Sequence, residues 1–317
     1  PIGLSVLLLH TLTVLAFATA LPRRTAEGKY IQSELEAEDV LERPLKVFTY
    51  FDRRYTRIGK TWRDCLPKAI PRPLASMSVE ATEIAKNTFL SSSSDRTPTE
   101  NFATLLLNEW ATKLTVTDTL HADPDAFLLQ DPAKGTTVSY PEADVVAAVD
   151  CVHDGQNCSW YRSQGYLDRH NGKDPLEAQG FMLSTGFMYM RSQPATTHLM
   201  KSALGVANKG ESEQVAINEA LLDFRCTWTT EDGFTAPRGQ EATSLLQTGV
   251  LHGLCSPHLG SHDSPDLQLR VVALPYSVVP RGDGFGSVGP QSLAYHPGGT
   301  VEDKEKLLGQ VRGLCKR

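Results

Sequence analysis

Residues 114–132, LTVTDTLHADPDAFLLQDP, decide how the chain is expected to fold. Apolar residues alternate with threonines at 114–117, and two carboxylates, Asp123 and Asp125, precede the apolar run at 126–129. This pattern predicts a buried strand whose end carries an acidic pair. In an open α/β sheet, ligands bind in the crevice outside the carboxyl ends of the strands, so the pair could hold a divalent cation against a phosphate.

Composition places the chain among ordinary globular proteins. It has 317 residues, of which 40% are hydrophobic and 21% charged, enough for one large α/β domain or two small ones. The formal net charge of −6 argues against nucleic acid as a partner.

The N-terminal 22 residues carry no charge and are followed directly by Arg23 and Arg24. An apolar run of this length can anchor the chain in a membrane or serve as a secretory signal peptide, with Ala-Thr-Ala at 18–20 as a cleavage site. Both alternatives place the rest of the chain in the secretory pathway. Residues 23–45 are charged and poor in aromatics, which is typical of a solvated stem, and residues 46–317 are expected to form the folded domain.

Six cysteines fit an oxidising compartment, and their spacing does not suggest zinc. Cys151 and Cys158 flank a loop-like stretch and are the favoured disulfide, while the other pairings stay open. Asn157 begins a glycosylation sequon.

Hydrophobic periodicity predicts strands that alternate with helices. The expected strands are residues 46–51, 143–150, 181–191 and 271–280; the expected helices are 100–113, 193–204, 213–224 and 302–314; residues 79–90 could form a helix and 91–95 a loop. This alternation predicts a mainly parallel sheet covered on both faces.

Five motifs in order, DPDAFLLQDP, ADVVAAVD, STGFMYMRS, EQVAIN and YHPGGTVEDK, resemble the nucleotide-diphospho-sugar transferase domain of plant and algal Golgi glycosyltransferases. The resemblance extends over residues 46–314. It implies a single GT-A domain of the α/β class, with a mainly parallel sheet flanked by helices. It also implies a type II Golgi membrane protein with a lumenal catalytic domain; a secreted protein is the alternative.

The resemblance implies a metal site. Asp123 and Asp125 match the family's Asp-x-Asp, whose carboxylates bind Mn²⁺ (or Mg²⁺) and, through it, the donor diphosphate. His296 matches a late histidine that completes the metal site in many such enzymes. A hard cation prefers these oxygen ligands and stabilises the charge of the departing nucleoside diphosphate. Without the resemblance, an acidic turn in solvent and an exposed histidine are the plainer interpretations.

The resemblance also implies residues that bind the donor sugar. Gln214 and Asn218 match the family's Asp-Gln-x-x-x-Asn and share a helix face, with the glutamine near the anomeric carbon. The alternative is the exposed face of an amphipathic helix. Ser184 and Gly186 stand where the family usually has Asn-x-Gly, and Glu213 replaces the usual aspartate.

Three further positions complete the expected site. Asp150 matches the acid that ends the ADVVAAVD strand and is a catalytic candidate that would bind sugar hydroxyls; the alternative is a capping acid. Gly299 suits a loop whose backbone approaches the phosphates, and Lys304 or Lys306 would supply positive charge. The tripeptide Arg281-Gly282-Asp283 is interpreted as an ordinary loop.

The predicted function is that of a metal-dependent glycosyltransferase acting with retention. Its donor is expected to be a nucleoside diphosphate sugar, a UDP-sugar by preference, and its acceptor a hydroxyl of a glycan, polysaccharide or protein. The alternative is a non-catalytic GT-A-like protein of the secretory pathway that binds sugars or stabilises a partner enzyme. The departures at Ser184 and Glu213 motivate that alternative.

Overall fold

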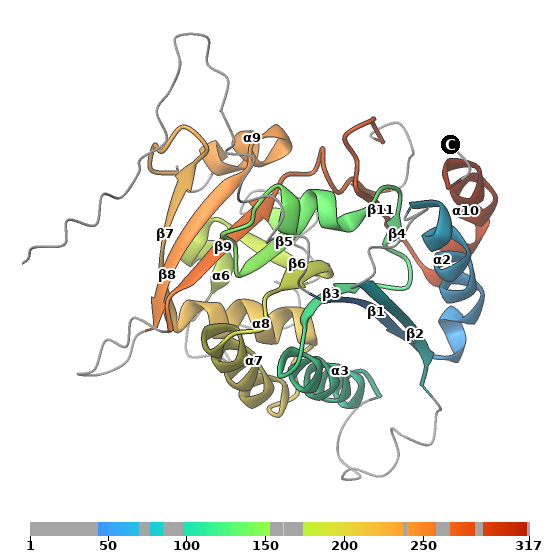
Figure 1. Ribbon diagram of the computed structural model, residues 1–317, viewed down its shortest axis with the longest axis horizontal. Helices are drawn as coiled ribbons and strands as arrows, with labels where there is room; N and C mark the ends of the chain where they lie inside the picture. Colours follow the sequence, from blue (N-terminus) through green and yellow to red (C-terminus); the bar gives the residue numbers. More distant parts are fainter. Residues whose placement is uncertain are drawn as a thin grey trace, which may run out of the picture. The chain divides into compact units, whose positions relative to one another are not determined.

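A large mixed sheet forms the centre of the fold (Figure 1). The computed structural model describes residues 44–69, 77–84, 98–152, 161, 174–236, 240–257, 267–282 and 288–315. In that part of the chain the sheet has eight strands in the order β2-β1-β3-β6-β5-β9-β8-β7. Their bounds are β1 Leu45–Phe51, β2 Met77–Glu83, β3 Asp118–Ala122, β5 Val145–Val152, β6 Phe181–Met190, β7 Phe224–Thr230, β8 Leu251–Pro257 and β9 Leu269–Leu274.

The expectation of a mainly parallel sheet was wrong. Strand β6 runs antiparallel to both β3 and β5, and β8 runs antiparallel to both β7 and β9. Parallel pairs join β1 to β2, β1 to β3, and β5 to β9. All ten residues of β6 are buried. A strand buried on both faces reads as a continuous apolar run whichever way it pairs, so its sequence did not indicate its direction.

A second, small sheet lies beside the main one. Its described strands are β10 Arg281–Gly282, β11 Ala294–Pro297 and β4 Phe127–Leu128, in the order β10-β11-β4. Strand β11 is antiparallel to β4, with Tyr295 opposite Phe127. This pairing brings a segment from the end of the chain against the residues that directly follow the acidic pair.

Helices cover both faces of the main sheet (Figure 1). One face packs against α3 Pro98–Leu114, α7 Pro194–Ala207, α8 Glu213–Leu222 and α9 Gln240–Thr248, around a core that includes Phe48, Trp110, Leu183, Ile217 and Val271. The other face packs against α2 Thr56–Ala69, α10 Val301–Leu314 and the small sheet, around a core that includes Val47, Trp62, Phe127, Tyr189 and Val311. Shorter helical segments are η1 Arg53–Tyr55, η3 Lys134–Val138 and α6 Pro175–Gln179.

The buried strand expected before the acidic pair is present, but it begins later than residue 114. Helix α3 continues to Leu114, Val116 is 78% exposed, and the strand before the acidic pair begins only at Asp118. Strand β3 has the sequence DTLHA and is buried throughout. The Asp118 carboxylate accepts hydrogen bonds from the Tyr189 hydroxyl at 2.7 Å and the Ser192 amide at 2.8 Å. Such partners let a polar sequence form a buried strand, and they are not visible in the sequence.

The helix considered for residues 79–90 is wrong for the described part of that range. Residues 77–83 form β2, which pairs in parallel with β1. The loop expected at 91–95 lies outside the described residues. The structure confirms the other expected elements, with bounds that differ by a few residues. The expected strands at 46–51, 143–150 and 181–191 correspond to β1, β5 and β6, and the one at 271–280 corresponds to β9, which ends at Leu274. The expected helices at 100–113, 193–204, 213–224 and 302–314 correspond to α3, α7, α8 and α10.

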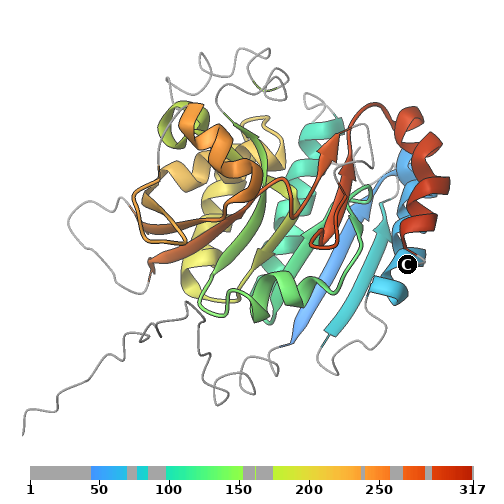
Figure 2. The same cartoon turned by 90° about the horizontal axis from the view of Figure 1, so that it is seen from above.

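Two disulfides join described cysteines: Cys65 to Cys315 and Cys226 to Cys255. The first ties α2 to the end of α10, and Figure 2 shows these helices side by side. Cys151 lies in β5 and is disulfide-bonded, but Cys158, its expected partner, and the sequon at Asn157 lie outside the described residues. So do residues 1–22 and nearly all of the expected stem. Within the described ranges, none of the helices is both long and apolar enough to cross a membrane.

Candidate metal and donor site

The acidic pair lies in a turn fixed between two central strands. The Asp123 amide donates to the carbonyl of Gly186 in β6 at 3.0 Å, and the Asp123 carbonyl accepts from the Ala126 amide at 2.9 Å. The Asp123 side chain is 29% exposed, whereas Asp125 is buried. One carboxylate therefore faces a space open to a ligand while the other is held inside the protein.

His296 meets this pair from β11. Its amide donates to the Pro280 carbonyl at 2.9 Å, which fixes the strand, and its ring Nε2 lies 3.3 Å from Asp125 Oδ1 and 3.7 Å from Asp123 Oδ2. One potential ligand atom from each of the three side chains lies within 4.8 Å of the other two. Two carboxylates and an imidazole form a donor set that suits Mn²⁺ or a similar divalent ion.

Gly186 keeps the space between these ligands open. A Cβ at this position would lie 2.6 Å from His296 Cε1 and 2.7 Å from Asp123 Oδ2, distances that real Cβ atoms essentially never show. Any side chain would therefore displace the imidazole or the carboxylate. The three residues together with this cradle fit a bound divalent cation.

Lys304 completes the surroundings of Asp125. A capping box between Thr300 and Asp303 starts α10, directly after Gly299 in a left-handed conformation at φ 84°. The first turn of the helix then carries Lys304 onto Asp125, to which its ammonium donates a hydrogen bond. Of the two lysines that the sequence left open, Lys304 reaches the acidic pair, while Lys306 pairs with Asp303 on the surface.

The charges around Asp125 favour its ionised form. Burial by itself would raise the pKa of this carboxyl, but His296 and Lys304 lower it well below its ordinary range. The pKa of Lys304 is raised in turn, since Asp125 outweighs the effect of burial. Asp125 is therefore a carboxylate at neutral pH, the form that a metal requires.

A second polar group centres on Asp150 in β5. Its carboxylate contacts the Arg281 guanidinium and accepts a hydrogen bond from Gln214 Nε2 at 2.6 Å. Arg281 also donates to the Ser184 hydroxyl at 3.1 Å. The pairing register of β5 with β6 shifts between Val149 and Cys151, so Asp150 lies at a bulge, a feature that redirects a strand side chain.

Asn218 faces the backbone of β6. Its Nδ2 donates to the carbonyls of Leu183 and Gln214, each at 2.8 Å, and its Oδ1 accepts from the Leu183 amide at 2.8 Å. Both amide hydrogens are thus used within the protein. This places Asn218 as a residue that fixes α8 to β6 and aligns Gln214, which lies one turn earlier on the same helix.

Arg281 is a site residue that sequence reasoning missed. Its interpretation as part of a loop was wrong, because Arg281 and Gly282 form β10 and pair with His296 and Pro297. Burial lowers the pKa of this guanidinium, with Asp123 and Asp125 opposing the shift, so the arginine lies within the electrostatic reach of both polar groups. The only sequence signal was a single arginine a few residues after an apolar strand, which does not distinguish it from a surface residue.

Two further residues bear on Asp123. His121, buried in β3, has its Nδ1 2.8 Å from the Thr185 carbonyl and its Nε2 4.0 Å from Asp123 Oδ1, and burial lowers its pKa. Glu213 opens α8, and burial followed by repulsion from Asp123 raises its pKa to about 7. The sequence marked Glu213 as a departure from the family pattern but did not predict its proximity to Asp123.

The described site carries net negative charge. With His296 in the neutral form that binds a metal, the three carboxylates of Asp123, Asp125 and Asp150 outnumber the two cations Arg281 and Lys304, before any charge on Glu213 is counted. An anionic diphosphate would be repelled by such a site unless a cation lay between them. The arrangement therefore suits a ligand that binds together with a divalent metal.

Comparison with known proteins is consistent with this chemistry. A family model described as nucleotide-diphospho-sugar transferase matches residues 117–289, more than half of the chain. The matched stretch contains the acidic pair and the Asp150 group; His296 and Lys304 lie beyond it. No curated protein matches the sequence significantly.

Several solved structures are similar, at low levels of identity. A glycosyltransferase involved in the glycosylation of the major capsid of PBCV-1 is 9% identical over 84% of this chain and 98% of its own, with a TM-score of 0.43. The galactosyltransferase LgtC is 12% identical over 55% of this chain and 69% of its own, with a TM-score of 0.36. Mouse xyloside xylosyltransferase 1 is 10% identical over 56% of this chain and 81% of its own, with a TM-score of 0.34.

Proposed function

The chain belongs to the nucleotide-diphospho-sugar transferase family, and we propose that it is a metal-dependent glycosyltransferase that moves a sugar from a nucleoside diphosphate sugar to a hydroxyl acceptor. One observation carries the proposal. A space that any side chain at position 186 would fill lies between Asp123, Asp125 and His296. The charge of the surrounding site would repel a diphosphate unless a cation lay between them.

Mn²⁺ is the metal that we propose, with Mg²⁺ as the alternative. Asp123, Asp125 and His296 would hold it, because two carboxylates and one imidazole satisfy a hard or intermediate divalent ion. When bound, the ion would offset the charge of the donor diphosphate. Lys304 keeps Asp125 ionised and correctly placed for this role.

The remaining side chains would bind and orient the donor. The Asp150 carboxylate, which contacts the Arg281 guanidinium, would accept hydrogen bonds from sugar hydroxyls. Gln214, aligned through Asn218, would lie against the sugar near its anomeric carbon. Arg281 and Lys304 would add positive charge near the phosphates, so most of the catalytic effect would be positioning and electrostatic stabilisation.

We propose transfer with retention from a UDP-sugar. The acceptor hydroxyl would attack the anomeric carbon from the face that the leaving group departs. As the bond from that carbon to the phosphate oxygen breaks and the bond to the acceptor oxygen forms, a phosphate oxygen would take the hydroxyl proton. This path needs no separate protein base, so Asp150, which is held by Arg281 and Gln214, is not required to take the proton.

Donor hydrolysis tests the proposal without knowledge of the acceptor. The full chain is incubated with a panel of UDP- and GDP-sugars, with Mn²⁺ or with a chelator, and released nucleotide is measured. We expect metal-dependent release from one donor. Asp125→Ala should abolish both release and metal-dependent donor binding, while Asp64→Asn, which removes an exposed negative charge on α2, should change neither.

The opposite result selects the alternative function. Undiminished release by Asp125→Ala would refute the proposed metal site. Absence of release from every donor, by folded protein that binds Mn²⁺, would favour a non-catalytic protein that binds sugars or stabilises a partner enzyme. The Ser184 hydroxyl gives that alternative little support, because it accepts a hydrogen bond from Arg281 and so has a role inside the site.

We also propose that the protein works in the secretory pathway, as a Golgi membrane protein or in secreted form. The apolar stretch at 1–22 and the pairing of Cys65 with Cys315 and of Cys226 with Cys255 support this placement, since disulfides persist in oxidising compartments. In this arrangement residues 1–22 are the signal or anchor, 23–45 the stem and 46–317 a single GT-A domain.

A further inference from the structure

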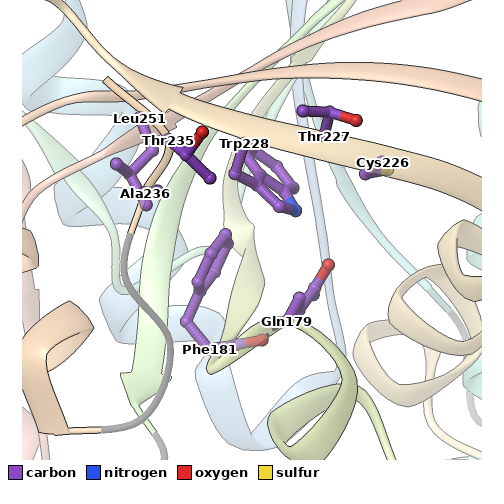
Figure 3. A pocket seen from close by; sticks show the side chains of 8 residues that line it. All are labelled: Gln179, Phe181, Cys226, Thr227, Trp228, Thr235, Ala236 and Leu251. Atoms are coloured by element: carbon purple, nitrogen blue, oxygen red, sulfur yellow. Dashed lines mark hydrogen bonds between the residues drawn. The ribbon is translucent and has the colours of Figure 1, made fainter. Parts of the chain in front are cut away.

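A small cavity lies beside the first residues of β6, away from the acidic pair (Figure 3). Its volume is about 100 Å³, roughly the space of several water molecules, which is enough for the edge of one sugar ring but not for an oligosaccharide. Strands β6, β7 and β8, the end of α6 and the segment after β7 supply its walls. The lining residues are Gln179, Phe181, Cys226, Thr227, Trp228, Thr235, Ala236 and Leu251.

The indole of Trp228 is the unusual feature of this cavity. The side chain is only 8% exposed, and its Nε1 is buried with no hydrogen-bond partner among the described residues. In Figure 3 the nitrogen points toward the space between the Phe181 ring and the Gln179 side chain. By contrast, Trp62 Nε1 donates to the Ala126 carbonyl at 2.9 Å, and Trp110 Nε1 donates to the Thr119 hydroxyl at 2.8 Å.

An unpaired buried donor is unfavourable, so its retention points to a ligand that accepts its hydrogen bond. The other lining groups define the chemistry of that ligand. Phe181 meets Trp228 edge to face, with ring centroids 4.9 Å apart, and together they offer aromatic surface. Gln179 Nε2 donates to the Phe181 carbonyl at 3.0 Å, which leaves its Oε1 as an acceptor.

The ligand should be uncharged. Among the residues that the structure describes, none with a charged side chain lines the cavity, so phosphates, carboxylates and cations would lose hydration without compensation. A purely apolar ligand would leave the indole N–H unpaired. A neutral sugar has apolar ring faces as well as hydroxyls that both donate and accept, so it suits an aromatic wall that also carries an indole N–H donor and an amide oxygen acceptor.

The position of the cavity relates it to the proposed reaction. Phe181 pairs with Val152, two residues beyond Asp150 on β5, and stands three residues from Ser184 on β6. Three residues of strand span roughly 10 Å. The cavity and the Asp150 group therefore lie close together at the same end of β5, within reach of one short glycan.

We propose that this cavity binds a neutral sugar unit of the acceptor glycan. That the sugar belongs to an acceptor rests on the proposed glycosyltransferase function. The binding of a neutral sugar rests on the cavity alone. Trp228 would donate a hydrogen bond to a ring or hydroxyl oxygen, and Gln179 would accept one from a hydroxyl.

Nitrogen-15 NMR of the indole groups tests the proposal on the full chain. The sequence has only four tryptophans, so each indole N–H gives a separate signal, and Trp228→Phe identifies that of Trp228 by its loss. Methyl glycosides of glucose, galactose, mannose, xylose and arabinose are titrated one at a time, with glucuronate as a charged comparison. We expect at least one neutral glycoside to shift the Trp228 signal saturably, and glucuronate to bind at least tenfold more weakly.

Two controls separate the possible outcomes. The signals of Trp62 and Trp110, which already donate within the protein, should not move, and Ala236→Leu, which fills the cavity from its wall, should abolish the shift while the Trp228 signal persists. A Trp228 signal that no glycoside moves would overturn the sugar site, even if donor hydrolysis succeeds. A saturable shift in a protein that hydrolyses no donor would instead retain the sugar site and refute the transferase reaction.

Discussion

At Gly186, a missing side chain shapes the candidate metal site. Replacement by alanine would place a methyl group 2.6 Å from the His296 ring and 2.7 Å from an Asp123 oxygen, so one ligand must move. We expect Gly186→Ala to fold but to bind Mn²⁺ at least tenfold more weakly, about 1.4 kcal/mol or more. Isothermal titration with Mn²⁺ measures the effect.

Gly205 offers a matched control for this substitution. It lies in α7, and a Cβ there would meet no atom within 4 Å. We expect Gly205→Ala to leave Mn²⁺ affinity unchanged and to raise the free energy of unfolding by about 0.5–1 kcal/mol, because alanine favours a helix over glycine. Equal Mn²⁺ affinity in the two variants would contradict the role given to Gly186.

Glu213 should make stability depend on pH. Burial and the neighbouring Asp123 raise its pKa from the ordinary 4.5 to about 7, so between these values the folded state binds more protons than the unfolded state. Stability attributable to this group therefore falls as pH rises from about 4.5 to 7, by no more than roughly 3 kcal/mol. Urea unfolding in the presence of a chelator, at pH 5 and pH 8, measures this effect. Relative to the wild type, Glu213→Gln should have a higher free energy of unfolding at pH 8 than at pH 5.

Added Mn²⁺ tests whether repulsion from Asp123 contributes to the raised pKa of Glu213. A cation bound beside Asp123 would cancel part of the repulsion and so shrink the pH-dependent difference between the wild type and Glu213→Gln. A difference that is the same at both pH values, with or without metal, would show that Glu213 titrates normally.

Sequence reasoning anticipated individual residues unevenly. Asp123, Asp125 and His296 were placed together through their order along the chain and a family resemblance, and the structure brings their ligand atoms within 4.8 Å. Arg281 was missed because its significance depends on β10 pairing with β11, a contact between short segments. Nor could the sequence show that both hydrogens of the Asn218 amide are used by backbone carbonyls.

At the level of elements, helix α8 is fixed to β6 by one side chain. Asn218→Ala would leave the amide and carbonyl of Leu183 without these buried partners. We expect a loss of about 2–4 kcal/mol in the free energy of unfolding, since an unsatisfied buried group costs about 1–3 kcal/mol. Donor turnover should fall as well, because Gln214 would lose its alignment toward Asp150.

Urea denaturation of Asn218→Ala beside Asn108→Ala measures this effect. Asn108 is exposed on α3, so its replacement should change stability by no more than about 0.5 kcal/mol. Similar losses in the two variants would mean that the hydrogen bonds to β6 contribute little.

The sequence predicted elements whose hydrophobic periodicity is strong. It missed or misplaced elements whose structure depends on contacts with residues distant in sequence. Helices α3, α7, α8 and α10 and strands β1, β5 and β6 were recognised from their apolar pattern. Strand β2 was not recognised, because it is half exposed beside β1. Strand β3 was expected before the acidic pair, but its start was placed too early, because it buries polar residues whose partners lie far away in sequence. Helix α2 was obscured by Pro67, which falls near its end.

For the molecule as a whole, the disulfide between Cys65 and Cys315 closes almost the entire folded region. It spans 250 residues and joins α2 to α10, the helix that carries Lys304 onto Asp125. The disulfide between Cys226 and Cys255 spans only 29 residues. Loop-closure entropy gives an upper value of roughly 5.5 kcal/mol for the long loop and roughly 3.6 kcal/mol for the short one.

We therefore expect the double variant Cys65→Ala/Cys315→Ala to lose more unfolding free energy than Cys226→Ala/Cys255→Ala, by about 2 kcal/mol. Contacts between the helices, such as the ion pair of Arg57 with Glu305 at 2.9 Å, are exposed and would recover little of the loss. Urea unfolding under non-reducing conditions measures both variants. Losses of equal size would show that α2 and α10 stay together in the unfolded ensemble or are held mainly by packing around Trp62 and Val311.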